Sequence, residues 1–153
     1  MIVYKVVEKL TENSFWSIIY NNHFRLEYRI GKKTVPKIGR IFVFKSLWKA
    51  KMWITNRSYW RHNIKNTKIL EGECNGTHLM KHKYCSSLYF DKTKKTAKKN
   101  IKNFWDVVIN NRKQRKKGFI SKEFAWFLWA TSTPKETYSC LEFTPTKEID
   151  IED

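Results

Sequence analysis

The chain opens with a run of apolar and β-branched residues, and several later segments alternate between apolar and polar positions. Residues 2–8 (IVYKVVE) favour a first strand. In residues 24–30 every second residue from Phe24 is apolar and the residues between them are charged, which predicts a strand with one buried face. Further strands are expected at residues 15–20, 41–44, 68–74 and 137–143.

Two segments carry the helical spacing of apolar residues instead. Ser46 suits the N-cap of a helix over residues 47–55, in which Leu47, Ala50 and Ile54 share one face. In the second segment apolar residues recur at i, i+3, i+4, i+7 and i+8, which predicts an amphipathic helix that closes before Gly118. These residues are Ile101, Phe104, Trp105, Val108 and Ile109.

Together the elements predict an α+β fold: a mostly antiparallel sheet with two or more helices, one of them amphipathic with basic flanks. The chain of 153 residues has no linker or internal repeat, so we expect a single domain over residues 1–153. No run of about 18 apolar residues occurs, and we expect no membrane association. Three cysteines, an odd number, favour a reducing compartment, so a cytoplasmic protein is expected.

Charge changes this picture most. The chain carries 31 Lys and Arg against 14 Asp and Glu, a formal net charge of +17. The excess is concentrated in a basic helical segment at residues 91–118, whereas residues 146–153 form an acidic C-terminal tail. A basic body of this kind predicts a polyanionic partner, nucleic acid or a ribonucleoprotein complex, with the tail off the contact surface or masking it.

The basic segment supplies most of the candidate contacts. Because lysine outnumbers arginine there, we expect it to contact backbone phosphates rather than base edges. Its candidate residues are Lys94, Lys95, Lys98, Lys99, Lys102, Arg112, Lys113, Arg115, Lys116 and Lys117. Part of this charge could equally be ordinary capping of the C-terminal end of the helix.

Aromatic and basic residues are interleaved elsewhere, for example in residues 48–53 (WKAKMW). Such rings can stack on unpaired bases, although any single ring is more often part of a core. Arg57, Trp60 and Arg61 lie in a loop-like stretch and are the candidates for exposed contacts of this type.

One short stretch holds four potential metal ligands: Cys74, His78, His82 and Cys85. Compact zinc sites can draw all their ligands from one loop, but this spacing matches no standard zinc motif. If residues 78–82 were helical, the two histidines would share a face. We therefore expect no cofactor, with zinc as the alternative; a Cys74–Cys85 disulfide is disfavoured by the compartment.

Enzyme signatures are scarce. The chain has no glycine-rich nucleotide-binding motif and no nucleophile-elbow motif. Glu71 and Glu73 would share one face of a strand, so a nuclease or nucleotide-processing enzyme that uses them with His78 and His82 is kept as an alternative. A third alternative is a protein-interaction module that docks on an acidic protein surface.

Three segments together carry a resemblance: residues 4–7 (YKVV), 39–53 (GRIFVFKSLWKAKMW) and 134–140 (PKETYSC). In their order they resemble small, uncharacterised α+β proteins encoded by bacteriophages. This resemblance implies no catalytic residue. It implies a phage accessory or anti-defence role, such as inhibition of a CRISPR complex, in the host cytoplasm. The lysine-rich segment at residues 91–118 departs from the group.

The function expected from the sequence is therefore a non-enzymatic, strongly basic binding protein that engages nucleic acid or a complex containing it.

Overall fold

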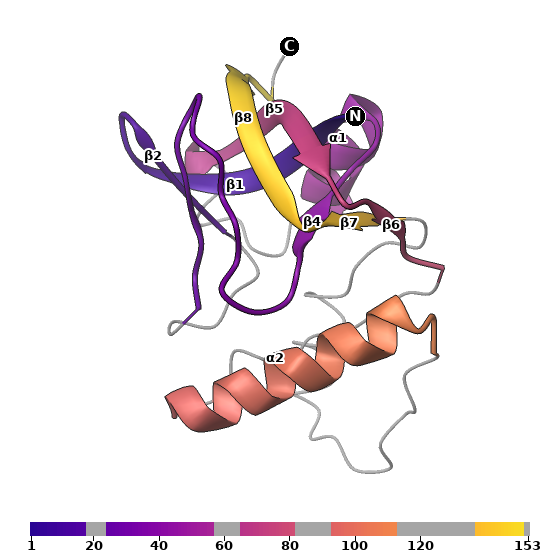
Figure 1. Cartoon of the computed structure of the whole chain (residues 1–153). Coiled ribbons are helices and arrows are strands. Elements are labelled where there is room, and N and C mark those ends of the chain that lie inside the picture. Colours follow the sequence, from indigo (N-terminus) through magenta and orange to yellow (C-terminus); the bar gives the residue numbers. More distant parts are fainter. Residues whose placement is uncertain (18–23, 57–64, 82–92, 113–136, 152–153) are drawn as a thin grey trace.

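A computed structural model describes residues 1–17, 24–56, 65–81, 93–112 and 137–151 (Figure 1). Over this part of the chain the expected α+β fold is confirmed, with two helices and mostly antiparallel strands. In Figure 1 helix α2 lies apart from the strands of the larger sheet, below the smaller sheet in the view.

The larger sheet has five antiparallel strands in the order β3-β2-β1-β5-β8. Its strands are β1 (Ile2–Thr11), β2 (Ser14–Ser17), β3 (Glu27–Tyr28), β5 (Thr67–Asn75) and β8 (Glu142–Ile149). The expected strands at residues 2–8, 15–20 and 68–74 correspond to β1, β2 and β5, except that residues 18–20 lie outside the described part.

Strand β1 is central in this sheet and is buried on both faces. Val3 and Val7 point into one core cluster, whereas Val6 packs in another cluster with α1. Since side chains alternate along a strand, Lys5 lies on the same face as the two valines, which are fully buried. A lysine therefore occupies a position in the row of core residues.

The smaller sheet has the antiparallel order β4-β7-β6, formed by β4 (Ile41–Val43), β7 (Tyr138–Cys140) and β6 (His78–Leu79). Only Leu141 separates β7 from β8, and a bridge between Tyr4 and Phe44 joins β1 to the end of β4. The chain thus turns from one sheet into the other at corners, and the two sheets enclose a common core.

Helix α1 (Leu47–Asn56) covers the outer face of β1 and β5. The Ser46 hydroxyl accepts a hydrogen bond from the Lys49 amide at 3.2 Å, as expected for an N-cap. Ala50 and Ile54 are buried, and Leu47 packs against the same cluster, so the expected helix and its apolar face are confirmed.

Helix α2 (Lys94–Ile109) starts at the N-cap Thr93 and packs against the loop before β4 and against β4 itself. Four residues of the expected apolar face, Ile101, Phe104, Trp105 and Val108, are buried there, whereas Ile109 is exposed. Trp105 packs on Phe42 with 4.7 Å between ring centroids. Neither α1 nor α2, in the part of the chain that is described, is long and apolar enough to cross a bilayer.

Helix α2 is shorter than the basic helical segment expected at residues 91–118. It begins at Lys94, so all the lysines between residues 94 and 102 lie on the helix. It ends at Ile109, well before Gly118, because Asn111 adopts a left-handed backbone with φ of 52°. Its last turn contains no basic residue, so capping of the C-terminal end does not account for the lysines at 94–102.

Two strand predictions also need correction. The strand expected at residues 24–30 is formed only by Glu27 and Tyr28, and Ile30 is exposed rather than buried. At the other end a single strand was expected at residues 137–143, yet this stretch is divided between β7 and β8, and β8 continues through Pro145. Because β8 is an edge strand and its register with β5 shifts at Gly72–Pro145, the missing amide of proline is tolerated there.

The acidic end of the chain is, through Ile149, part of this edge strand rather than a separate tail. Glu148 pairs with Lys9 at 3.0 Å, and Asp150 pairs with Lys68 at 3.4 Å. These carboxylates therefore neutralise lysines of the larger sheet itself.

Candidate functional site

The lysines of α2 form an exposed stripe on the first half of the helix. Their spacings of one, three and four residues place them on neighbouring positions of one side, next to the buried face. Lys94, Lys95, Lys98, Lys99 and Lys102 are all exposed and constitute the α2 lysine face. Five of the predicted contact residues are thus brought together by one element.

The α2 lysine face has no counter-charges among the described residues. None of its five lysines makes an ion pair with a described residue, whereas the acids of the larger sheet are largely engaged. The engaged pairs are Lys9–Glu148, Arg25–Glu8, Lys33–Glu142, Lys68–Asp150 and Lys147–Glu71. Exposed lysines without an ion pair to a described residue also occur elsewhere, for example Lys32, Lys65 and Lys81, but these are scattered, whereas the five on α2 are neighbours on one helix.

The position of the face is electrostatically unfavourable for the helix alone. The N-terminal end of a helix carries partial positive charge, and the first turn of α2 contains lysines and no acid. Lys94 and Lys98, and likewise Lys95 and Lys99, are like charges four residues apart, which costs about 0.2–0.5 kcal/mol per pair. An external anion would remove both penalties.

Arg112 is the other candidate from this segment that is described. It follows α2, is exposed and forms an ion pair with Asp106 on the last turn, so it serves a local partner. The remaining candidates lie outside the described residues: Lys113, Arg115, Lys116, Lys117, Arg57, Trp60 and Arg61.

On α1, the aromatic rings interleaved with basic residues lie in two different environments. Trp53 packs toward Phe44 with 6.0 Å between ring centroids, as a core ring would. Trp48 is 67% exposed and is thus available for stacking.

The candidate metal ligands that are described have other partners. Cys74 on β5 and Cys140 on β7 are buried free thiols of the same core cluster. His78 belongs to strand β6, not to a helix, and its Nε2 lies 3.2 Å from the Val108 carbonyl near the end of α2. His82 and Cys85 lie outside the described residues, within which no group of three potential ligands gathers.

Burial prevents ionisation of these two thiols. It raises the pKa of Cys74, and it raises the pKa of Cys140 to about 12, with the neighbouring Cys74 as a further cause. A thiol that stays protonated at neutral pH is a poor nucleophile and a poor metal ligand. The two described cysteines therefore act as small core residues.

The acidic pair of the enzyme alternative lies on β5, as expected. Glu71 forms an ion pair with Lys147 at 3.3 Å, and Glu73 is exposed. His78 is the described histidine of this alternative, and it contacts the Val108 carbonyl rather than either glutamate.

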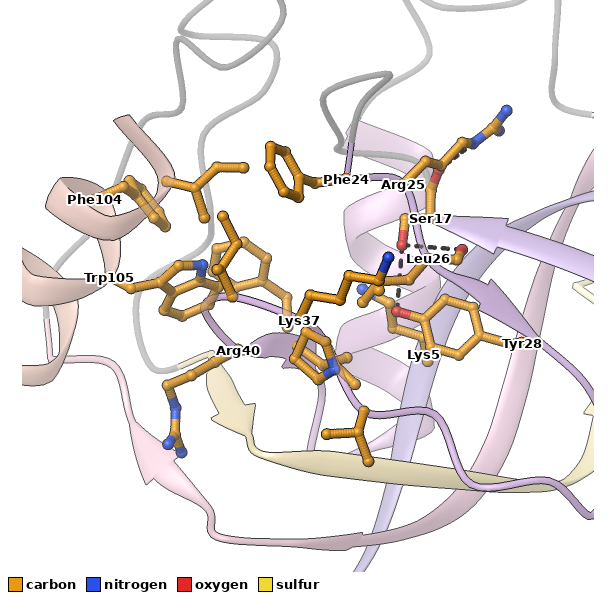
Figure 2. A pocket seen from close by; sticks show the side chains of 16 residues that line it. Lys5, Ser17, Phe24, Arg25, Leu26, Tyr28, Lys37, Arg40, Phe104 and Trp105 are labelled. Atoms are coloured by element: carbon orange, nitrogen blue, oxygen red, sulfur yellow. Dashed lines mark hydrogen bonds between the residues drawn. The ribbon is translucent and has the colours of Figure 1, made fainter. Parts of the chain in front are cut away.

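A cavity of about 240 Å³ lies between the apolar face of α2 and the inner ends of the strands (Figure 2). Phe104 and Trp105 of α2 and Phe42 of β4 form an aromatic wall, with Lys5 and Tyr28 on the side of the larger sheet. Among the described residues that line it, four are Lys or Arg and none is Asp or Glu.

Sequence reasoning missed Lys5, the least ordinary residue of this cavity. The side chain is 9% exposed, and its ammonium group lies 6.0 Å from the centroid of the Tyr28 ring. It forms no hydrogen bond or ion pair with a described residue. The available signal was the alternation Val3, Lys5, Val7, which places a lysine on the core face of a β-branched strand.

Comparisons with protein families, with curated proteins and with solved structures found no match to this chain. The resemblance to small bacteriophage proteins therefore stays a prediction.

Proposed function

We propose that this protein binds nucleic acid through the α2 lysine face, by contacts to backbone phosphates. The observation that supports the proposal is the gathering of five exposed lysines without a described counter-charge on one helix, while most acids of the larger sheet pair with other basic residues. Each phosphate neutralised by a lysine releases condensed counterions, which provides the free energy of binding.

The dimensions of the face agree with this role. A helix rises 1.5 Å per residue, so the stretch from Lys94 to Lys102 covers about 12 Å. That length corresponds to about three or four successive phosphates of one strand, measured along a duplex axis. Lysine acts as a point charge without the planar fork of arginine, so we expect little preference for base sequence.

The experiment compares two triple variants that lose the same charge. One carries Lys95→Gln, Lys98→Gln and Lys102→Gln on α2; the control carries Lys32→Gln, Lys65→Gln and Lys81→Gln at exposed positions elsewhere. Glutamine is chosen because its helix propensity is close to that of lysine. Fluorescence anisotropy with a labelled single strand and a labelled duplex is recorded over a range of salt concentrations.

The α2 variant should lose about tenfold or more in affinity at low salt, and the slope of log affinity against log salt should fall by about two to three. In the control, the change in slope should be smaller than that expected for the loss of one phosphate contact. Equal losses in the two variants would show that only net charge matters and would refute the assignment to α2.

Within this proposal, a phage accessory or anti-defence role would follow if the bound nucleic acid belongs to a host defence complex. Binding of the wild-type protein, but not of the α2 variant, to a purified guide-RNA effector complex is the test of that role.

A further inference from the structure

The cavity beneath α2 carries charge that the fold itself does not require. An ammonium group placed in a protein core is normally paired with a carboxylate, because burial removes the water that stabilises its charge. Lys5 has no such partner in the described structure, and only the face of the Tyr28 ring contacts it as a weak cation acceptor. Burial accordingly lowers the pKa of Lys5 to about 8, so the group is still largely protonated at neutral pH.

The other cations of the cavity separate into engaged and free groups. Arg25 is paired with Glu8 at 2.5 Å. Arg40 donates to the Ser139 hydroxyl at 2.9 Å, and its guanidinium points away from Lys5 in Figure 2. Lys37 is exposed at the cavity and forms no ion pair with a described residue.

Figure 2 shows the side chains of Lys5 and Lys37 pointing toward the hydroxyl groups of Ser17 and Tyr28. These two hydroxyls lie 3.3 Å apart, in hydrogen-bond contact. The cavity thus presents two uncompensated ammonium groups beside two hydroxyl groups. Two positive charges without a carboxylate match a dianion, and a phosphate monoester carries nearly two negative charges at neutral pH.

The opposite wall suits a planar ring. The Phe42 and Trp105 rings lie 4.7 Å apart by their centroids, and Phe104 stands edge-on to Trp105 at 5.2 Å. Aromatic walls of this kind stack nucleobases with little regard to base identity. A volume of about 240 Å³ limits the ligand to a small one.

We propose that this cavity binds the terminal phosphate monoester of a nucleotide, with the phosphate at Lys5 and Lys37 and the base toward the aromatic wall. The nucleotide is either free or the phosphorylated end of a strand, since the two share this chemistry. The site is separate from the α2 lysine face, so its occupation by a free nucleotide does not depend on the proposed function.

The test is isothermal titration calorimetry of the full-length protein at pH 7. The probes are uridine monophosphate, uridine, inorganic phosphate, and a short oligonucleotide with either a 5′-phosphate or a 5′-hydroxyl. Uridine monophosphate should bind at least about tenfold more tightly than uridine or inorganic phosphate. A matching preference for the 5′-phosphorylated oligonucleotide would identify a strand end as the source, and its absence would identify the free nucleotide.

Three variants complete the design. Lys5→Met and Lys37→Gln should each weaken binding of uridine monophosphate by about tenfold, whereas the exposed control Lys32→Gln should leave it unchanged. Lys37 is exposed, so its substitution keeps the test valid even if Lys5→Met alters the fold. The triple α2 variant should still bind uridine monophosphate, which separates failure of this site from failure of the lysine face.

The proposal is overturned if neither phosphorylated probe binds at about millimolar concentration, or if both lysine variants bind as well as the wild type.

Discussion

The ammonium group of Lys5 lies 6.0 Å from the centroid of the Tyr28 ring, inside a core whose neighbouring positions on the same strand are Val3 and Val7. The ammonium group is suited to bind an anion, but its buried position destabilises the charged form. Burial lowers the pKa of Lys5 from 10.5 to about 8. This shift means that burying the protonated side chain lowers the free energy of unfolding by about 3 kcal/mol. Functional groups often cost stability in this way.

The first prediction is therefore that Lys5→Met stabilises the unliganded protein at pH 7. The gain should be about 1–3 kcal/mol, because the variant removes a desolvated charge and keeps most of the side-chain volume. Chemical denaturation at pH 7 measures it, with the exposed Lys32→Met as control. A loss of stability in Lys5→Met would mean that the ammonium group has a compensating partner.

The same pair of proteins should show a pH-dependent difference. Because the pKa of Lys5 is lower in the folded state, the unfolded chain binds more protons between pH 8 and 10.5, and the Lys5 penalty fades with rising pH over that window. The gain from Lys5→Met should thus shrink above pH 8. The titratable groups near Lys5 are Tyr28 and Cys140, and they are common to both proteins, so the difference isolates Lys5.

A second prediction concerns the close approach of Gly39 to Trp105. A methyl group on Gly39 would lie 2.3 Å from atoms of the Trp105 ring, and Gly39 has φ of +77°. Gly31 has nearly the same backbone, φ of +79°, with no atom within 4 Å of the added carbon. Gly31→Ala should therefore cost about 1–2 kcal/mol for the backbone alone.

Gly39→Ala should cost about 1–3 kcal/mol more than Gly31→Ala, because the added carbon displaces Trp105 and with it α2. Chemical denaturation of the two variants gives the difference directly. Equal costs in both would show that α2 can move away from the loop before β4 without penalty.

Local patterns in the sequence predicted most elements, and tertiary context decided their lengths. Ser46 and the spacing of Leu47, Ala50 and Ile54 located α1, because a cap and an apolar face are local signals. The strand expected from alternation after Phe24 was shortened to two residues, because only Glu27 and Tyr28 find a partner in β2. The alternation within one segment does not determine whether that segment pairs with a distant strand.

In the candidate site, too, the sequence identified residues, whereas their contacts depended on the fold. The lysines of α2 were identified from charge alone, but their unpaired state depends on which acids the fold brings to other lysines, as Glu71 is brought to Lys147. The cavity depends on the contact of α2 with β4 and the loop before it, which joins residues far apart in the chain. Cys74 was a candidate metal ligand because the core cluster that buries it, which includes Cys140, is formed by residues distant in sequence.

A third prediction is that Lys94→Glu together with Lys95→Glu has opposite effects on stability and on binding. Acidic side chains in the first turn interact favourably with the helix dipole and with Lys98 and Lys99 one turn later, so stability should rise by about 0.5–2 kcal/mol. Affinity for nucleic acid should fall.

Thermal denaturation and anisotropy measured on the same preparation test this pair of effects. The double variant Lys94→Gln and Lys95→Gln is the matched control and should lie between wild type and the glutamate variant in both measurements. If the glutamate variant were less stable than wild type, the assignment of these lysines to the positive end of α2 would be wrong.

The last prediction concerns the thiols of Cys74 and Cys140, which are buried in the same core cluster. Burial raises the pKa of both, that of Cys140 to about 12, so neither forms appreciable thiolate at pH 8. Iodoacetamide reacts with the thiolate, so both should stay unmodified in the native protein and react fully in denaturant. Peptide mass spectrometry after alkylation distinguishes the two cysteines.

Because the unfolded chain ionises these thiols first, they should also lower stability above about pH 9, and Cys140→Ala should reduce that loss. Rapid labelling of Cys74 in the native protein would instead show that the end of β5 opens, and it would return this cysteine to the set of available metal ligands.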